Sequence, residues 1–198
     1  MEQGNRKNMK EVEVVYAANG AEWREWLEKN HASMEAVWVV FYTKASRKAT
    51  MQWTEAVDEA LCFGWIDSKK VAIDHEKSHQ FFSRRKPGST WSRINKEKIV
   101  RLIESGKMTD AGLKSIEIAK QNGSWTILDS VEDLLVPEDL EAAFALRSGS
   151  AEFFSSLSKS VKKMMLYWLV SAKKPETRQK RIEELADHAA RQTKPKGF

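Results

Sequence analysis

Only one cysteine, Cys62, occurs in the sequence, so an internal disulfide cannot form. The sequence also lacks an apolar run of membrane-spanning length, and its first residues lack the apolar segment of a secretory signal. No glycine-rich phosphate-binding loop is present, which removes the support for nucleotide hydrolysis. From these absences we expect a cytoplasmic protein that is not inserted in a membrane.

The residues that are present predict a well-packed globular protein. The chain has 198 residues, of which 41% are hydrophobic, and this is enough to bury a core. Eight tryptophans supply large, rigid side chains for that core, and charged residues, 31% of the chain, are numerous enough to cover the surface.

Positive charge is concentrated in one part of the chain. Residues 69–107 contain 11 Lys and Arg against 4 Asp and Glu, a net charge of +7, whereas the whole chain carries +5. A cluster of this kind attracts anions when its members are exposed together. The segment is therefore the main candidate for a binding surface.

The first part of the chain has the patterns of an α/β unit. Val12, Val14 and Tyr16 alternate with other residues, which predicts a short strand. Asn19 stands three residues before Glu22, the spacing of a capping box, and predicts a helix over residues 20–30.

The most strongly predicted strand covers residues 36–42, Ala-Val-Trp-Val-Val-Phe-Tyr, which are almost all apolar and rich in β-branched and aromatic side chains. We expect this strand to be central, with Trp38 or Val40 facing the core. If Trp38 is fully buried, its replacement by alanine should cost roughly 3–5 kcal/mol.

A second helix and a β-hairpin are predicted to follow. Apolar residues recur at helical spacing from Ala56 to Phe63, and Gly64 stands where a left-handed cap ends a helix. Residues 65–73 and 79–83 then form two short runs typical of a hairpin.

Beyond Pro87 the pattern is helical, with one extended piece expected at residues 124–128. Ser158 is expected to cap a helix whose inward stripe is Val161, Met164, Met165, Trp168, Leu169 and Ala172. Pro175 should open a last helix with Ile182, Leu185, Ala186 and Ala189 inward. The predicted organisation is a disordered terminus at 1–11, an α/β sandwich at 12–90, a helical connection at 91–135 and a helical region at 136–198.

Three segments carry a resemblance to a known family. They are residues 58–68 (Asp-Glu-Ala-Leu-Cys-Phe-Gly-Trp-Ile-Asp-Ser), residues 82–95 with Arg84-Arg85-Lys86-Pro87 and Trp91-Ser92-Arg93-Ile94-Asn95, and the tail from Tyr167-Trp168 to Ala172-Lys173-Lys174-Pro175-Glu176-Thr177-Arg178. In order and spacing they resemble the YdeI/OmpD-associated, or bacteriocin-protection, family.

The resemblance implies an α+β fold and a link to peptide-antibiotic stress. The front half is distantly similar to the frataxin/YjbR-like superfamily, a small α/β sandwich, and a C-terminal helical extension follows it. The family description implies protection against stress and names no reaction.

Two short motifs have the residue types of catalytic sites. His75-Glu76-Lys77-Ser78-His79 fits the zinc-hydrolase pattern, which requires a helix and a third ligand, whereas the flanking residues predict strands joined by a turn that holds both histidines. We therefore expect no metal there and no cofactor elsewhere. Ser156-Leu157-Ser158-Lys159 lacks the partner motifs of penicillin-recognising enzymes, so we attribute it to chance.

Cys62 is expected to be a buried structural thiol. It lies at the C-terminal end of its predicted helix, where the helix dipole opposes a thiolate. A free cysteine of this kind is usually buried as a small apolar side chain.

The predicted ligand-binding residues surround the basic segment. Lys98 is expected to join them on one rim if the hairpin and the following helix lie together. The alternative for Arg84 or Arg85 is burial in a pair with a carboxylate such as Asp67, and the alternative for the whole segment is a solvated surface. The candidate residues are Asp67, Lys69, Lys70, Arg84, Arg85, Lys86, Trp91, Arg93, Asn95 and Lys96.

The leading functional hypothesis is a non-enzymatic, cytoplasmic binding or stress-protection protein with a basic anion-binding surface, whose partner is an anionic ligand or a nucleic acid. The alternative is an enzyme that acts on a small anionic substrate in a pocket bordered by Asp67, Arg84, Arg85 and Trp91.

Overall fold

A computed structural model describes residues 12–198, so the predicted terminus at 1–11 lies outside the described residues. The chain forms two compact units. The sheet unit comprises the described residues up to Ser89 together with Glu97–Gln121, and the helical unit comprises Thr90–Lys96 and Asn122–Phe198. The predicted α+β class is confirmed, since a mixed four-stranded sheet is combined with helices throughout the chain.

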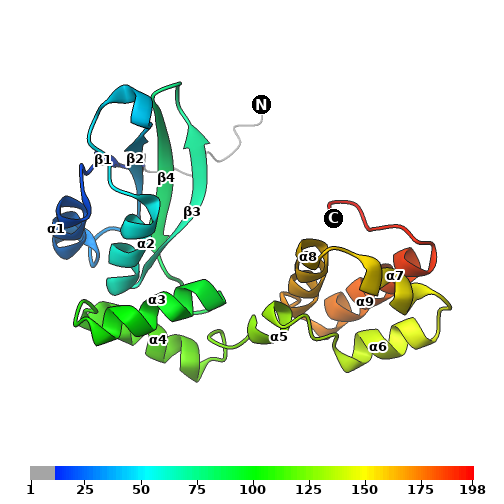
Figure 1. Ribbon diagram of the computed structural model, residues 1–198. Helices are drawn as coiled ribbons and strands as arrows, with labels where there is room; N and C mark the ends of the chain where they lie inside the picture. The colour runs from blue at the N-terminus through cyan, green and yellow to red at the C-terminus, as the bar shows by residue number, and fades with distance from the viewer. Residues whose placement is uncertain (1–11) are drawn as a thin grey trace, which may run out of the picture. The chain divides into compact units, whose positions relative to one another are not determined.

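The sheet has the order β1-β2-β4-β3 (Figure 1). β1 (Val14–Tyr16) is parallel to β2 (Ala36–Tyr42), whereas β4 (Lys77–Arg84) is antiparallel to both β2 and β3 (Trp65–Ala72). The strand over residues 36–42 is central, as predicted, and β3 and β4 form the predicted hairpin. A register shift between Asp67 and Lys70 interrupts the pairing of β3.

Two helices, α1 (Gly20–Asn30) and α2 (Trp53–Cys62), cover one face of this sheet (Figure 1). The predicted cap of α1 is confirmed, because the Asn19 side chain accepts a hydrogen bond from the Glu22 backbone N–H at 3.0 Å. The core beneath the helices is fully buried and consists mainly of Trp23, Leu27, Val37, Val39, Leu61, Trp65 and Phe82.

The other face of β2 is only partly buried. Val40 is 8% exposed and Trp38 is half-buried, and both point away from α1 and α2, so the prediction that one of them faces the core holds only in that Val40 is buried. Because Val37 and Val39 alternate with Trp38, the two sets of side chains point to opposite faces. Trp38 is thus not fully buried. Its replacement by alanine should therefore lower the free energy of unfolding by less than the roughly 3–5 kcal/mol expected for a fully buried side chain.

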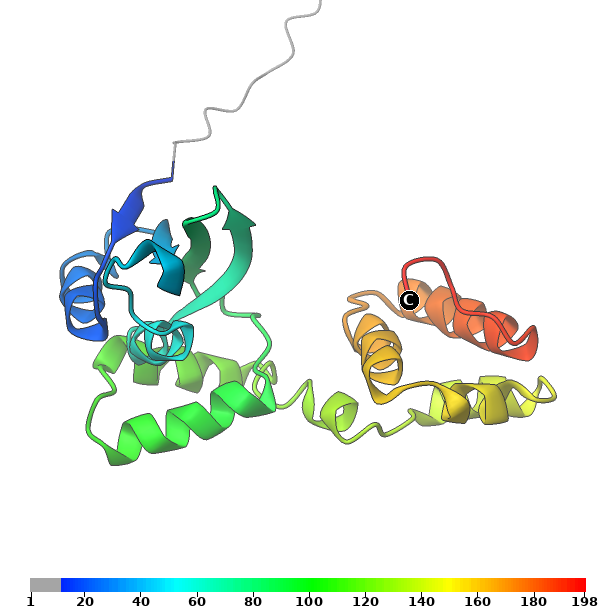
Figure 2. The same cartoon turned by 45° about the horizontal axis from the view of Figure 1, so that its top comes forward.

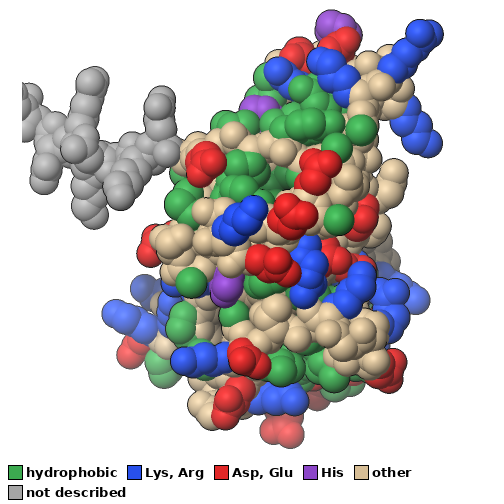
Figure 3. Space-filling view, turned by 90° about the vertical axis from the view of Figure 1, so that its left-hand side faces the viewer, with side chains coloured by type: hydrophobic (Ala, Val, Ile, Leu, Met, Phe, Trp, Pro, Cys, Tyr) green, Lys and Arg blue, Asp and Glu red, His purple; other side chains and the backbone are tan. Residues whose placement is uncertain are grey.

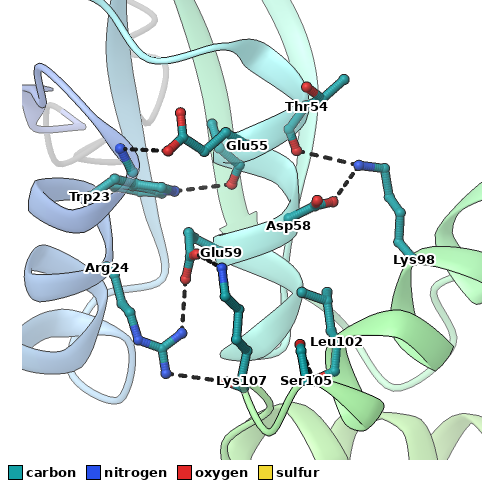
Figure 4. A network of polar contacts seen from close by, with 12 residues as sticks. Trp23, Arg24, Thr54, Glu55, Asp58, Glu59, Lys98, Leu102, Ser105 and Lys107 are labelled. Atoms are coloured by element: carbon teal, nitrogen blue, oxygen red, sulfur yellow. Dashed lines mark hydrogen bonds and ion pairs between the residues drawn. The ribbon is translucent and has the colours of Figure 1, made fainter.

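Buried ion pairs attach α2 to the elements around it (Figure 4). The Asp58 carboxylate contacts the Lys98 ammonium of α3 (Arg93–Glu104), and Lys98 also donates to the Thr54 carbonyl at 3.3 Å. The Glu59 carboxylate, 8% exposed, lies 2.8 Å from the Arg24 guanidinium of α1 and 3.4 Å from the Lys107 ammonium. Within the sheet unit, these pairs hold α3 and the loop that precedes α4 (Asp110–Gln121) against α2.

The helical unit contains α5 (Asp129–Glu132), α6 (Glu138–Ala145), α7 (Ser150–Ser156), α8 (Lys159–Val170) and α9 (Pro175–Ala190), as Figure 2 shows. Its core includes Leu140, Phe144, Phe154, Leu166, Leu169, Ile182 and Leu185. All four residues predicted to point inward from the last helix are buried, and Ser158 caps α8 as predicted.

Three details differ from the predictions for the second half of the chain. Residues 124–128 form turns rather than an extended piece, and α7 was not predicted. On α8, Met164 is 46% exposed and Leu166 is buried in its place, because the packed face is centred one position further along the helix. No helix among residues 12–198 is both long and apolar enough to span a membrane.

Candidate functional site

A hollow of about 390 Å³ lies in the sheet unit where β4 ends. Its walls come from the end of α1, the turn after α2, the end of β4 and one face of α4. The residues that give it chemical character are His31, Phe63, Arg84, Arg85, Lys114 and Ser115.

Arg84 is an exposed side chain with a fixed orientation. Its Nη2 donates to the carbonyls of Ala32 at 3.2 Å and Met34 at 2.8 Å, and its backbone N–H donates to the Glu35 carbonyl at 2.9 Å. These bonds tie the guanidinium to the turn after α1. The rest of the guanidinium can still donate to a ligand, since arginine has five N–H donors.

Arg85 is the more buried of the two arginines. Burial lowers its pKa to about 10, and the nearby Asp67 carboxylate opposes that shift. The guanidinium is still charged at neutral pH. A cation that has lost part of its hydration interacts more strongly with an anion than an exposed one does, because the local dielectric constant is lower.

Two glycines allow α4 to approach the end of α2. Gly64 has φ +72°, as predicted for a left-handed cap, and a Cβ there would lie 3.1 Å from both the Ala111 carbonyl oxygen and the Ser115 Cβ. A Cβ on Gly112 would lie 2.3 Å from the Cys62 carbonyl oxygen, a distance that real contacts do not show. The close packing brings Lys114 and Ser115 to the hollow that Arg85 also lines.

The hollow combines an apolar wall with positive charge. Phe63 packs against His31, with 5.1 Å between the ring centroids. The cations Arg84, Arg85 and Lys114 also line the hollow, and none of the described residues that line it carries a carboxylate. Such a site favours a small molecule that has both an anionic group and an apolar part.

Asp67 does not line this hollow. Its carboxylate accepts hydrogen bonds from the Trp53 indole at 3.0 Å and the Gln80 amide at 3.3 Å. Its effect on Arg85 is electrostatic. Burial of Arg85 and this effect of Asp67 are two features of the alternative in which Arg85 is buried in a pair with that carboxylate.

Trp91 belongs to the helical unit and is 1% exposed. Its ring packs on Trp125, with 5.1 Å between the centroids. A ring buried in this way presents no face to a ligand, so the predicted pocket of Asp67, Arg84, Arg85 and Trp91 is not formed by residues of one unit.

The remaining candidate residues divide into exposed and paired side chains. Lys69, Lys70 and Lys86 are exposed in the sheet unit. In the helical unit, the Arg93 guanidinium lies 2.6 Å from the Asp133 carboxylate, the Lys96 ammonium contacts the Asp129 carboxylate, and Asn95 is half-buried.

The expectation that Lys98 lies on an exposed rim is wrong. Its side chain is 9% exposed and contacts Asp58, because α3 packs against α2 (Figure 4). The net charge of residues 69–107 therefore overstates the positive surface.

His31, Lys114 and Ser115 were not predicted as site residues. Lys114 lies outside the segment of concentrated charge, and the sequence gives no signal that α4 packs against the turn at Gly64. The sequence indicates only that Lys114, Ser115 and Ile118 lie close together on one face of the predicted helix.

The two histidines of the zinc-hydrolase pattern lie in different elements. His75 is in the hairpin turn as predicted, whereas His79 is in β4 and pairs with Val40 and Val71, which corrects the prediction that both lie in the turn. Burial lowers the pKa of His79. Within residues 12–198 no group of three or more His, Cys, Asp and Glu is placed to hold a metal ion.

The Cys62 thiol is fully buried, as predicted. Burial raises its pKa to about 11, and the Glu59 carboxylate adds to the shift. We expect alkylation by iodoacetamide at pH 8 to be very slow in the folded protein and complete in denaturant, because only the thiolate reacts. Rapid stoichiometric labelling of the folded protein, measured by mass spectrometry, would contradict the buried position.

Comparison with known proteins gives two family matches. Residues 15–115 match the family described as a domain of unknown function (DUF8412), and residues 133–192 match the family described as bacteriocin-protection, YdeI or OmpD-associated. The second match supports the resemblance seen in the sequence. No curated protein and no solved structure matches the chain, and the distant similarity to the frataxin/YjbR-like superfamily stays a prediction.

Proposed function

The chain belongs to the family described as a domain of unknown function (DUF8412), and we propose that it is a non-enzymatic binding protein for a small anionic molecule with an apolar part. The proposed site is the hollow beside Arg84 and Arg85. One observation carries the proposal: three cations line the hollow together with apolar side chains such as Ile118, and none of the described lining residues carries a carboxylate.

The geometry favours binding over the enzymatic alternative. That alternative requires Asp67 to point into the pocket as an acid, base or ligand, whereas its carboxylate already accepts two hydrogen bonds outside the lining. A partly dehydrated guanidinium in a hollow that also has apolar lining side chains is sufficient to bind and orient an amphipathic anion.

The proposal includes a role in stress protection within the cytoplasm. It is supported by the description of the family that matches residues 133–192, which refers to bacteriocin protection. The helical unit carries that match, so the anion site and the protective role are assigned to different units of the chain.

Titration with 2-naphthoate and phenyl phosphate tests the site. We expect both anions to bind. The uncharged 2-naphthamide should bind much more weakly, because its amide carries no negative charge. Arg85→Ala and Lys114→Ala should each weaken binding roughly 10- to 100-fold, since a hydrogen bond to a charged group contributes about 1.5–3 kcal/mol. Isothermal titration calorimetry measures the affinities.

Lys86→Ala is the matched control, because Lys86 follows Arg85 in the chain, is exposed and does not line the hollow. It removes the same charge and should leave the affinity nearly unchanged. Equal losses in the Lys86→Ala and Lys114→Ala variants would show general electrostatic attraction and contradict a defined site. Thermal unfolding of each variant separates lost binding from lost folding.

A further inference from the structure

The face of the sheet opposite α1 and α2 carries aromatic side chains rather than the polar residues of a solvated face. Residues paired across antiparallel strands share a face, and Trp38 pairs with Phe81 while Val40 pairs with His79. β1 adds Tyr16, whose register partner is Val40. Since Val37 and Phe82 pair on the covered face, this second set points away from the helices.

The rings on this face are arranged in two pairs. Trp38 and Phe81 meet edge to face with 4.9 Å between the centroids, and Tyr16 and Tyr42 do so at 5.4 Å. The Tyr16 hydroxyl donates to the Ala49 carbonyl at 2.6 Å, which fixes its ring, and Tyr16 is still 48% exposed. Rigid, partly exposed rings of this kind are surfaces on which flat molecules stack.

Cations lie beside the aromatic pairs. The Lys48 ammonium stands over the Tyr42 ring, 4.6 Å from its centroid, and Lys77 is the register partner of Tyr42. Their carboxylate partners are distant for ion pairs, at 3.6 Å from Lys48 to Glu76 and 3.8 Å from Lys77 to Asp74. Such exposed pairs are weak, so both ammonium groups are available to an anionic chain.

Figure 3 shows the side of the molecule on which α1 lies, where hydrophobic side chains gather above a band in which Lys and Arg stand beside Asp and Glu. The mixed band on that side offers no uniform positive surface to a rigid polyanion.

We propose that this aromatic sheet face, defined by Tyr16, Trp38, Tyr42 and Phe81 with Lys48 and Lys77, binds single-stranded nucleic acid. Bases stack on the rings, and the two ammonium groups contact the phosphates. Every base has a flat face, so binding has little sequence preference. A duplex keeps its bases stacked inside and cannot use the rings. The face is separate from the hollow beside Arg84, so this inference does not depend on the proposed small-molecule site.

Fluorescence anisotropy with a labelled 15-nucleotide oligo(dT) and with a duplex of equal length tests the proposal on the full chain. We expect the single strand to bind and the duplex to bind far more weakly. Trp38→Ala should reduce the affinity at least about tenfold, because removal of a stacking ring commonly has an effect of this size. Lys48→Ala with Lys77→Ala should make the affinity less dependent on salt, since fewer counterions are released.

Trp53→Ala is the matched control for the ring, because Trp53 is 50% exposed and lies on α2, away from this face. Arg84→Ala is the control for the hollow. Both should leave the oligo(dT) affinity unchanged. Equal binding of single strand and duplex, or an unchanged affinity in a Trp38→Ala variant that circular dichroism shows to be folded, overturns the proposal. Self-association that Trp38→Ala abolishes would assign the face to a second copy and overturn it as well.

Discussion

Replacement of Trp23 by alanine should lower the free energy of unfolding by about 3–5 kcal/mol, the range for loss of a large buried aromatic side chain. Trp23 is fully buried, its ring stacks on Trp26, and it also contacts Phe82, with centroid distances of 5.1 and 5.3 Å. Its indole N–H donates to the Ala56 carbonyl at 3.1 Å. The substitution therefore leaves a cavity between α1, α2 and the sheet and removes a buried hydrogen bond to the Ala56 carbonyl.

Trp38→Ala is the matched comparison for this effect. Trp38 is the same residue type in the same unit but is half-buried on the other face of the sheet, so the loss should be about 1–2 kcal/mol. Urea unfolding followed by circular dichroism measures both values. Similar losses for the two variants would contradict the assignment of the core to the face covered by α1 and α2.

Asp58→Ala should destabilise the sheet unit by about 3 kcal/mol. The substitution leaves the Lys98 ammonium buried with only the Thr54 carbonyl, at 3.3 Å, as an acceptor. Removal of one partner of a buried ion pair usually costs 3–5 kcal/mol, and the partial exposure of Asp58, 28%, places the effect at the lower end. Urea unfolding of this variant gives the free energy directly.

The double variant Asp58→Ala with Lys98→Met removes the charge together with its partner. Its stability should lie well above that of Asp58→Ala, because methionine fills the same space without an unpaired charge. A double variant no more stable than Asp58→Ala would mean that the loss comes from packing and not from the buried ammonium.

The elements with the strongest local patterns were predicted from the sequence. The cap at Asn19, the central strand at residues 36–42 and the inward residues of α9 depend on short-range rules of capping and periodicity, and the structure has all three. The turns at 124–128 and the shifted face of α8 depend on which neighbouring elements pack there. Local periodicity does not contain that information.

The candidate site was predicted only in part. Arg84 and Arg85 are adjacent in the sequence and stood out by charge, whereas Lys114 reaches them only because Gly64 and Gly112 let α4 approach α2. Lys98 was predicted to belong to the exposed cluster because of its charge. In the fold it is buried, and the Asp58 carboxylate neutralises it. A count of charges along the chain cannot distinguish a buried pair from an exposed cation.

The most direct test of the anion site observes the Arg85 side chain during ligand binding. In the NMR spectrum of arginine Nε–H groups, titration with 2-naphthoate should shift the Arg85 signal in a saturable way, while exposed Arg101 and Arg191 outside the hollow remain unchanged. The signal of Arg85 is identified as the one that disappears in the spectrum of the Arg85→Lys variant. An Arg85 signal that stays unmoved at saturating ligand, or that shifts only in parallel with Arg101 and Arg191, would contradict the proposed function.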